Sequence, residues 1–416
     1  MAVALSGGGD SLALTLLLRD WALARGGQVT ALIVDHGLRR ESGLEAAATA
    51  RVAQDLGLAA QILVWEEEPP RSGLQASARA ARYRLLCRAC RDLGLLYLAL
   101  GHHRDDQAET LLLRAESGSG PLGLAAMSRL KVLPEVLLLR PLLQEPKAVL
   151  LDSLRRRALQ WVEDPTNRDR RHKRVALRAL RPQLRAQGLT APALAEATRS
   201  LGATRRALEL EALTWLAGAS RWLPLGYVSL DRDALVKAPP LLAALALAVV
   251  LRAVGGRSFA PPLPAVAALL GRLGAKGGGP TTLGGCRLLR RGGTLLAVRE
   301  EQGTTSLDLR PGAAGLWDRR FRVALSPAAP DGLRLGILTR RRWEALGLRR
   351  GGGEVPPPVF WSMPCIFDRD GPLALPLVAW VRPESGVEEL LESEPQTLSL
   401  HFAPADLPGC ALFTVA

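Results

Sequence analysis

The segment Leu5–Leu14, LSGGGDSLAL, has residue types and spacing that could bind a phosphate group. Its three glycines separate a short apolar run from a helix-like run. Glycine lets the backbone approach a ligand and adopt positive φ, and the N–H groups at a helix N-terminus attract anions. A carboxylate at Asp10 could hold Mg²⁺, and the hydroxyl of Ser11 could donate to a phosphate oxygen. We therefore expect a nucleotide and metal site built from Ser6, Gly7, Gly8, Gly9, Asp10 and Ser11.

Two further clusters contain groups that suit a nucleotide. Asp35 and His36 end the apolar run VTALIV, and an acid at such a position often meets a ribose or a metal. A helix cap is the alternative for Asp35. Arg79 and Arg82 lie three residues apart in the helix-like string LQASARAARY, so both could face a phosphate. A solvated basic face explains these two arginines equally well.

The string GHHRDDQAET, residues 101–110, is the densest group of titratable side chains. His102 or His103 could bind phosphate or metal. The acids of this string could bind Mg²⁺ or an ammonium group, and two of them share a helix face at i and i+4 spacing. A zinc site lacks support, since neither an H-E-x-x-H pattern nor a nearby cysteine is present. The candidate acids are Asp105, Asp106 and Glu109.

The segment Trp161–Pro182 is strongly basic and suits contact with a phosphate backbone, although a solvated charge run is the alternative. The whole chain supports a polyanion as partner, because its formal net charge is +14. A base-composition bias that enriches arginine explains part of this charge. The candidate contacts are Arg168, Arg170, Arg171, Lys173, Arg174 and Arg178.

Alternating strand-like and helix-like segments must position these clusters. Four apolar runs, separated by helix-like segments, predict βαβ units with a parallel sheet. Ligands of such sheets gather at the carboxyl ends of the strands, where the clusters after Leu5, Val34 and Leu100 all lie. The expected strands are Ala2–Leu5, Val29–Val34, Gln61–Trp65 and Leu95–Leu100.

The 416 residues are too many for one typical domain and predict two or three. Residues 183–270 have helix-like composition, the run 281–299 reads as short strands, and residues 307–416 read as mixed or β-rich. We expect no signal peptide, because site-like sequence begins at Ser6. The apolar run Leu241–Leu251 is too short to span a membrane, and five cysteines without a disulfide pattern favour a reducing cytoplasm.

Two literal motif matches carry little weight. The G-x-G-x-x-G string at residues 118–123 follows a helix rather than a strand, so it lacks the dinucleotide-binding context. Cys87 and Cys90 form a C-x-x-C inside an expected helix, where both thiols should lie on one buried side. A role in metal binding or sulfur transfer would need a second cysteine pair, which the sequence does not place nearby.

The hexapeptide SGGGDS resembles the signature of PP-loop ATP pyrophosphatases, and it lacks the lysine of a Walker loop. Further strings in the same order resemble the tRNA(Ile)-lysidine synthase family, densely over about the first 180 residues. Weaker similarity continues in TLGGCRLLRRGG and LWDRRFRV. The sequence strings on which this resemblance rests, besides SGGGDS, are VDHGLR, LQASARAARY, GHHRDDQAET, SGSGPLGLAAM, RPLL and EDPTNRD.

The resemblance implies a Rossmann-like α/β PP-loop domain over residues 1–182. It also implies a mostly helical tRNA- or substrate-binding domain over 183–300 and a small C-terminal tRNA-binding domain, mixed α/β or β-rich, over 307–416. The implied reaction uses ATP and Mg²⁺ to adenylate the wobble cytidine of a CAU-anticodon tRNA(Ile), after which the ε-amine of L-lysine displaces AMP. Such an enzyme would be a cytoplasmic ligase without a membrane partner.

Roles for individual residues follow from the same resemblance. Asp10 would hold the metal, acids of the string GHHRDDQAET would orient lysine or take its proton, and a cation would offset charge at the α-phosphate. The implied catalytic residues are Asp10, Arg79, His102 and Asp106. The implied nucleotide ligands are Ser6, Gly7, Gly8, Gly9, Asp10, Ser11, Asp35 and His36. The implied lysine ligands are Asp105, Asp106 and Glu109.

The sequence departs from the family pattern in three places. Members usually carry several more residues before the first strand, so we expect the natural start to lie upstream. Val175 follows Arg174 where an asparagine is usual, and Arg319 replaces a glycine in the string WDRRF, so a different turn is expected there. A PP-loop tRNA thiolation enzyme and an inactive RNA-binding protein with a nucleotide fold remain as alternatives.

Overall fold

The computed structural model describes residues 1–39, 41–67, 73–133, 135–162, 173–274, 281–304, 306–347, 355–378, 380–381 and 398–404. The chain forms two compact units, Met1–Arg206 and Ala207–Ala416, and each is described by itself. Helix α9 (Ala191–Ala219) runs through the boundary. Within the described ranges, no helix combines the length and apolar character needed to cross a membrane.

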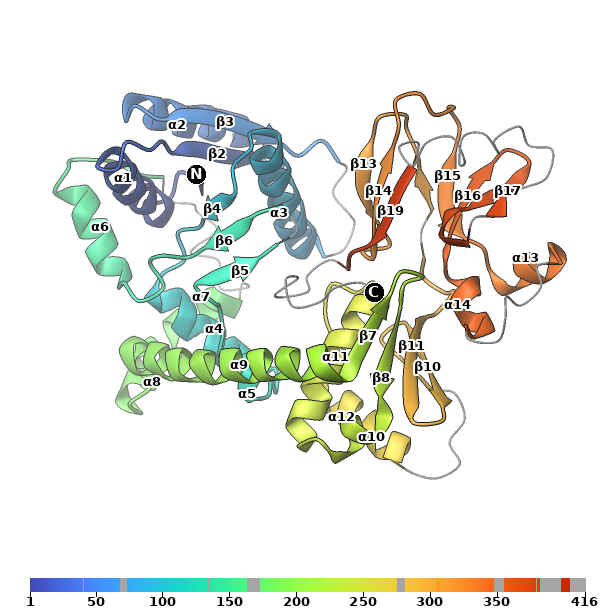
Figure 1. Cartoon of the computed structure of the whole chain (residues 1–416). Helices are drawn as coiled ribbons and strands as arrows, with labels where there is room; N and C mark the ends of the chain where they lie inside the picture. The colour runs from blue at the N-terminus through green and yellow to red at the C-terminus, as the bar shows by residue number, and fades with distance from the viewer. Residues whose placement is uncertain are drawn as a thin grey trace. The chain divides into compact units, whose positions relative to one another are not determined.

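A six-stranded sheet forms the centre of the first unit, in the order β3-β2-β1-β4-β6-β5 (Figure 1). All neighbouring pairs are parallel except β5 with β6. The four expected strands are confirmed within a few residues, whereas β5 and β6 were not foreseen. The strands are β1 (Ala2–Ala4), β2 (Thr30–Asp35), β3 (Ala59–Val64), β4 (Tyr97–Ala99), β5 (Leu130–Val132) and β6 (Leu137–Leu139).

Helices cover both faces of this sheet because its strands are apolar on both sides. Val3 and Ile33 pack with apolar side chains of α1, α2 and α6 on one face. Ala2 and Leu32 face the opposite side, where α3 packs. The helices of the unit before α9 are α1 (Gly9–Leu23), α2 (Ser42–Asp55), α3 (Leu74–Asp92), α4 (Arg104–Glu116), α5 (Pro121–Leu124), α6 (Lys147–Arg155), α7 (Lys173–Ala179) and α8 (Arg181–Ala186).

The order of the strands defines where a ligand should bind. The chain moves from β1 outward to β2 and β3, then returns to place β4 on the other side of β1. Such a reversal is the topological switch point, and ligands of open α/β sheets bind outside the carboxyl ends of the strands there. The glycine loop follows β1, and the string GHH follows β4. The predicted α/β fold with a mainly parallel sheet is therefore confirmed.

The described residues of the second unit form three antiparallel sheets. The first consists of β7 (Ser220–Leu223), β8 (Tyr227–Asp231), β11 (Thr294–Arg299), β10 (Cys286–Arg291) and β9 (Thr281–Leu283). The second consists of β12 (Leu307–Asp308), β15 (Arg334–Ile337), β16 (Pro364–Asp368), β17 (Gly371–Leu375) and β18 (Trp380–Val381). The third consists of β13 (Ala314–Trp317), β14 (Phe321–Leu325) and β19 (Leu398–Phe402).

Helices of the second unit are α10 (Arg232–Lys237), α11 (Pro240–Val254), α12 (Leu263–Gly274), α13 (Arg340–Ala345) and α14 (Pro357–Trp361). The strands β7 and β8 correct the expectation of helical structure over residues 183–270, because a glycine turn at Gly226 (φ +83°) joins them as a hairpin within that range. One hydrophobic core includes residues from Ala212 to Phe402. The division into domains at 183–300 and 307–416 stays a prediction.

A buried ion cluster joins the turns of the second unit. Asp318 accepts hydrogen bonds from Nε of Arg299 (3.1 Å) and Nε of Arg320 (2.7 Å), and both arginines are at most 3% exposed. Arg299 also donates to the carbonyl of Gly285, in the turn before β10. Arg319 adopts φ +54° in the turn between β13 and β14, a left-handed conformation that glycine adopts more readily than arginine.

Candidate functional site at the switch point of the first sheet

The glycine loop is shaped by contacts that a larger residue would disturb. Gly7 has φ +80°, and a Cβ there would lie 2.7 Å from Oγ1 of Thr49. Ser11 fastens the loop from the first turn of α1, since its hydroxyl donates to the carbonyl of Gly8 (2.9 Å) and accepts from the N–H of Ser6 (3.2 Å). The hydroxyl of Ser11 thus shapes the loop, while Ser6 is exposed beside it.

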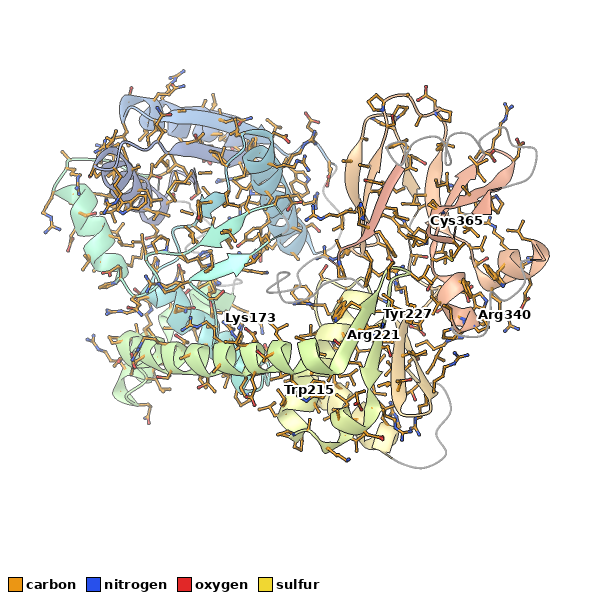
Figure 2. All side chains as sticks on the ribbon, in the orientation of Figure 1. Lys173, Trp215, Arg221, Tyr227, Arg340 and Cys365 are labelled. Atoms are coloured by element: carbon orange, nitrogen blue, oxygen red, sulfur yellow. The ribbon has the colours of Figure 1, made fainter. Side chains whose placement is uncertain are left out.

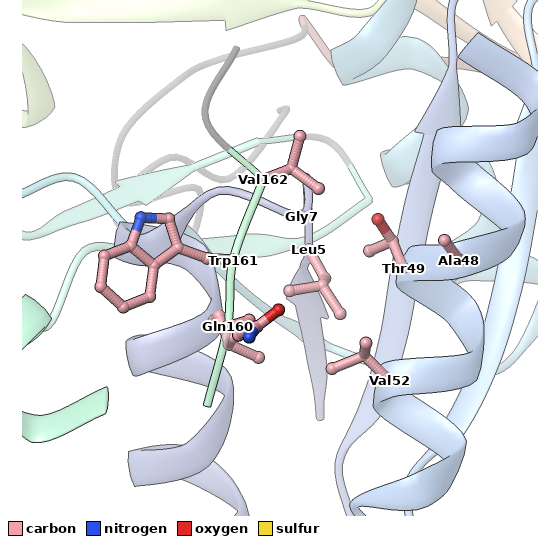
Figure 3. A pocket seen from close by; sticks show the side chains of 9 residues that line it. Leu5, Gly7, Ala48, Thr49, Val52, Gln160, Trp161 and Val162 are labelled. Atoms are coloured by element: carbon pink, nitrogen blue, oxygen red, sulfur yellow. The ribbon is translucent and has the colours of Figure 1, made fainter. Parts of the chain in front are cut away.

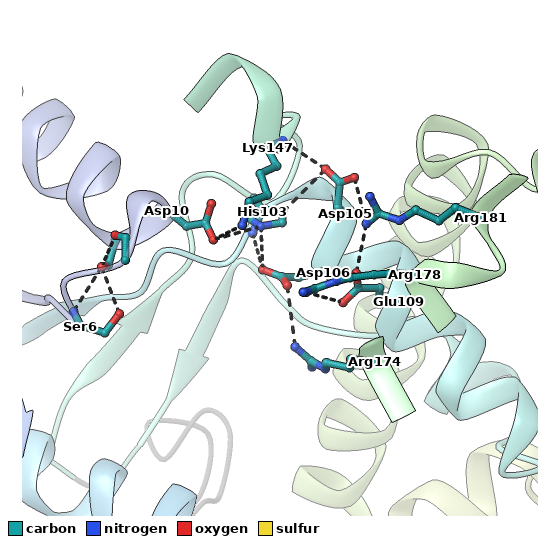
Figure 4. Close-up of polar contacts among 12 residues, drawn as sticks. Ser6, Asp10, His103, Asp105, Asp106, Glu109, Lys147, Arg174, Arg178 and Arg181 are labelled. Atoms are coloured by element: carbon teal, nitrogen blue, oxygen red, sulfur yellow. Dashed lines mark hydrogen bonds and ion pairs between the residues drawn. The ribbon is translucent and has the colours of Figure 1, made fainter. Parts of the chain in front are cut away.

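A polar network connects the loop to the helix that follows β4 (Figure 4). Oδ2 of Asp10 lies 3.5 Å from Nε2 of His103, and the same nitrogen lies 3.5 Å from Oδ2 of Asp106. The backbone N–H of His103 donates to Asp106 Oδ2 (3.1 Å). The backbone turn after β4 packs closely on α1, because a Cβ at Gly101 would lie 2.9 Å from the carbonyl oxygen of Asp10. Asp10 and Asp106, two predicted catalytic residues, are therefore brought together.

Lys147 completes this network, although the sequence analysis did not single it out. Its Nζ donates to Asp10 Oδ2 at 2.9 Å, and its backbone N–H donates to Asp105 Oδ2 at 3.1 Å. Burial raises the pKa of Asp10, but the hydrogen bond from His103 and the ammonium of Lys147 outweigh it, so the pKa lies below its usual value. Burial lowers the pKa of His103, and the carboxylates of Asp10 and Asp106 reverse this, leaving it raised.

The predicted lysine ligand Glu109 is paired inside the protein. Its carboxylate is 3% exposed and accepts from Arg178 at 2.6 Å and from Arg181 at 3.1 Å. Asp105 also lies 3.3 Å from Arg181, and Asp106 lies 3.7 Å from Arg174. The three predicted acids therefore gather on α4, and arginines of α7 and α8 neutralise them.

Some basic residues predicted to contact RNA belong to this network. Arg174 and Arg178 face acids of α4, and Lys173, at the start of α7 (Figure 2), lies 3.1 Å from Glu116. The hydrogen bonds with Glu109 raise the pKa of Arg178. The predictions for Arg168, Arg170 and Arg171 lie outside the described residues.

His102 lies in a strongly cationic environment. Burial, followed by the charges of Arg140, Arg79, Arg82 and Arg174, lowers its pKa to about 3. In the part of the chain that the structure describes, no carboxylate lies at ion-pair distance from Arg79, Arg82 or Arg140, whereas Arg174 pairs with Asp106. The charge of the predicted residue Arg79 thus acts on His102, and the group of arginines suits an anion.

We expect the protonation of His102 to lower the stability of the folded chain at acidic pH. A buried neutral histidine with a lowered pKa binds fewer protons than the unfolded chain, so stability falls as the pH drops below 6.5 toward 3. In His102→Asn this loss should be smaller by about 1–2 kcal/mol between pH 7 and pH 5. Urea unfolding at both pH values measures it. Equal losses in variant and parent would contradict the neutral histidine.

The residues after β2 form a separate group. Oδ1 of Asp35 accepts from the N–H of Gly37 at 2.9 Å, so this acid closes a turn rather than capping a helix. His36 packs edge-on against Trp65 with ring centroids 6.1 Å apart. Burial and the charge of Arg82 lower the pKa of His36. No contact of Asp35 or His36 with the network around Asp10 is seen among the described residues, and their nucleotide role stays a prediction.

A cavity of about 200 Å³ lies next to the glycine loop (Figure 3). Its wall is mainly apolar, with Thr49 and Gln160 as polar members. The N–H of Val162 donates to the carbonyl of Gly7 at 3.0 Å and so holds one side of the cavity to the loop. Among its described lining residues, Gly7 is the one predicted site residue. They are Leu5, Gly7, Leu12, Ala48, Thr49, Val52, Gln160, Trp161 and Val162.

The cysteine pair of α3 is buried, as predicted. Cys87 is 7% exposed and Cys90 is 0% exposed, and burial raises their pKa values to about 12 and about 11. Burial likewise raises the pKa values of Cys286 and of Cys365, on β16 (Figure 2), to about 12. Thiols of this kind are poor nucleophiles, so the described cysteines give the thiolation alternative no reactive sulfur.

The switch-point loop, its acid and the α/β sheet define a PP-loop domain, and the PP-loop family model ATP_bind_3 matches residues 1–184. Relatives described as tRNA(Ile)-lysidine synthase extend the likeness. The Ruegeria pomeroyi protein is 36% identical over 332 residues, 80% of this chain and 78% of its own. The Caulobacter vibrioides protein is 33% identical over 381 residues, 89% and 85%. This chain belongs to the tRNA(Ile)-lysidine synthase family.

Other likenesses are more limited in extent. The Bradyrhizobium diazoefficiens tRNA(Ile)-lysidine synthase is 46% identical over 235 residues, which are 56% of this chain. The match spans only 63% of that relative's length. Among solved structures, the U34-tRNA thiolase NcsA from Methanococcus maripaludis has a TM-score of 0.42 and 20% identity, covering 50% of this chain and 70% of its own.

Proposed function

We propose that this chain ligates L-lysine to the wobble cytidine of a tRNA(Ile) with a CAU anticodon, consuming ATP and releasing AMP and pyrophosphate. The observation that carries the proposal is the convergence of Asp10, from the glycine loop, with the acids of α4 in one network. A phosphate-binding loop and carboxylates suited to an ammonium group are the two sites that such a reaction needs. Membership of the family supports the same substrates.

The residues also fit a magnesium ion at Asp10. Oδ1 of Asp10 is buried without a hydrogen-bond partner in the described chain, so it has free capacity for a cation. No group of three or more His, Cys, Asp or Glu side chains able to hold a metal occurs among the described residues. Magnesium usually takes one or two carboxylates together with substrate phosphates. Bound there, it would neutralise charge on the phosphates.

The chain's own groups have distinct tasks in the proposed reaction. In the first step, the O2 of cytidine attacks the α-phosphorus of ATP and pyrophosphate leaves. The arginines around His102 range from buried (Arg140) to exposed (Arg79), and they would stabilise the charge that develops on the phosphate. Backbone N–H groups of the loop and the first turn of α1 would hold the triphosphate.

In the second step, the ε-nitrogen of lysine attacks C2 of the base, and AMP leaves with the oxygen. The ammonium group must first lose a proton to become a nucleophile. Asp106 is the best placed acceptor, because among the described residues its Oδ1 is paired with Arg174 alone, at 3.7 Å, whereas two arginines hold Glu109 closely. A loop base that is turned out of its stack could reach this position.

Incorporation of labelled L-lysine into unmodified CAU tRNA(Ile), with and without ATP, tests the proposal. We expect ATP-dependent incorporation that is absent with elongator methionine tRNA of the same anticodon. ATP-independent labelling would exclude an adenylated intermediate. Absence of labelling, with tRNA-dependent AMP release in the presence of a sulfur donor, would favour thiolation instead.

We expect the basic segment before α7 to contact the tRNA backbone. Replacing Arg170 and Arg171 with alanine should weaken tRNA binding and lower the slope of log affinity against log salt by about 2, because each phosphate contact releases counterions. Filter binding at several salt concentrations measures the slope. An unchanged slope would assign these arginines to a solvated face.

A further inference from the structure

The glycine loop has no cationic side chain of its own. Residues 6–11 contain three glycines, two serines and Asp10, whereas a Walker loop carries a lysine that reaches the terminal phosphates of its nucleotide. A triphosphate bound here would bring four negative charges next to the carboxylate of Asp10. A cation from elsewhere in the chain is therefore needed beside Asp10.

Lys147 is placed to supply that cation. It is separated from Asp10 by 137 positions, yet its Nζ lies 2.9 Å from Asp10 Oδ2 (Figure 4). Its side chain is 43% exposed, so solvent and ligands can reach the ammonium group. Its backbone is held separately, because its N–H donates to Asp105 Oδ2. The side chain can thus change partners while the backbone stays in position.

The position of Lys147 in its helix supports a role in binding. Pro146 is the N-cap of α6, so Lys147 is the first helical residue. A cation in the first turn is disfavoured by the helix dipole, and α6 has no acidic residue in that turn to offset it. A half-exposed pair with Asp10 contributes little to folding. Helix stability therefore does not explain why a lysine stands there.

We propose that Lys147 binds the β- and γ-phosphates of the nucleotide held by the glycine loop, and so takes the place of the missing loop lysine. The inference rests on the proposed function for the identity of that nucleotide. Without ligand, the ammonium of Lys147 neutralises Asp10. With ligand, it exchanges this carboxylate for phosphate oxygens, and the unpartnered Oδ1 of Asp10 is available for magnesium.

Calorimetric binding of magnesium pyrophosphate and of AMP to the whole chain tests the inference without turnover. Lys147→Met should weaken pyrophosphate binding about tenfold or more, since a charge-assisted hydrogen bond is lost. AMP binding should change less than twofold, because AMP lacks both terminal phosphates. Lys147→Arg should recover most of the affinity. Arg156→Met, at an exposed cation that follows α6, is the matched control and should bind as the parent does.

Two outcomes would overturn the inference. Lys147→Met could bind pyrophosphate as tightly as the parent, which would leave Lys147 as a surface ion pair. Alternatively, Lys147→Met and Lys147→Arg could each lose AMP binding to the same extent as pyrophosphate binding. That result would assign Lys147 to shaping the loop. Failure of the proposed function gives a different result: the parent would bind pyrophosphate in a Lys147-dependent manner and still incorporate no lysine into tRNA.

Discussion

Replacing Asp10 with alanine is expected to lower tRNA-dependent pyrophosphate release about a thousandfold or more. The substitution removes the carboxylate that faces His103 and Lys147 and whose Oδ1 has free capacity for a cation. Binding of tRNA should stay within about twofold of the parent, because the basic segment is not altered. Release of labelled pyrophosphate and filter binding of tRNA measure the two properties on the same preparation.

Asp20→Ala is the matched control for this experiment. Asp20 lies on the same helix, α1, is half-exposed and pairs with Arg19, so its loss should leave pyrophosphate release nearly unchanged. A joint loss of pyrophosphate release and tRNA binding in Asp10→Ala would indicate misfolding and would weaken the assignment of the site. Full activity would exclude Asp10 from the chemistry.

Replacing Asp318 with alanine is expected to destabilise the second unit by about 3–5 kcal/mol. The substitution leaves the guanidinium groups of Arg299 and Arg320 buried without their shared carboxylate. Burial already lowers the pKa of Arg320, although the charge and hydrogen bond of Asp318 oppose it, which shows how poorly the site solvates a charge. Urea unfolding followed by tryptophan fluorescence measures the change, with Trp317 directly beside the cluster.

Asp331→Ala is the control for Asp318→Ala, since Asp331 is exposed and the described structure gives it no ion pair. Its free energy of unfolding should remain within about 0.5 kcal/mol of the parent. A loss of less than about 1 kcal/mol in Asp318→Ala would mean that water or backbone carbonyls solvate both arginines well enough alone.

Local patterns were sufficient to predict four strands of the first sheet, whereas β5 and β6, of three residues each, were missed. The apolar runs are short and bounded by glycine or charged residues, and parallel order follows from the intervening helices. Strands β7 and β8 were missed because Ser220–Leu223 has four residues and lies between Ala- and Leu-rich helices. The two strands pair with each other locally, but β8 also pairs with β11, more than 60 residues later, and no local pattern reveals that second pairing.

The sequence predicted those residues of the candidate site that stand in local motifs, and it missed those that only the folding of the chain brings there. Asp10 and Asp106 stand in recognisable strings, and the structure brings them together. Lys147 reaches the site through the packing of α6, so its residue type alone gave no signal. Arg181 belongs to the basic segment Trp161–Pro182, but its pairing with acids of α4 depends on the packing of α8. A proline directly before a helix that starts with a cation was the available clue for Lys147. The pairing of Glu109 with arginines is likewise a property of the fold.

The buried thiols have a consequence for oxidative damage. Peroxide attacks the thiolate form of cysteine, and a pKa near 11 or 12 leaves almost none of it at neutral pH. Cys87 and Cys90 are residues of α3 whose side chains pack in the core between this helix and the sheet. An oxidant can therefore reach them only when α3 opens locally. Cys87 and Cys90 should therefore resist oxidation for as long as the first unit stays folded, and their oxidation would report its unfolding.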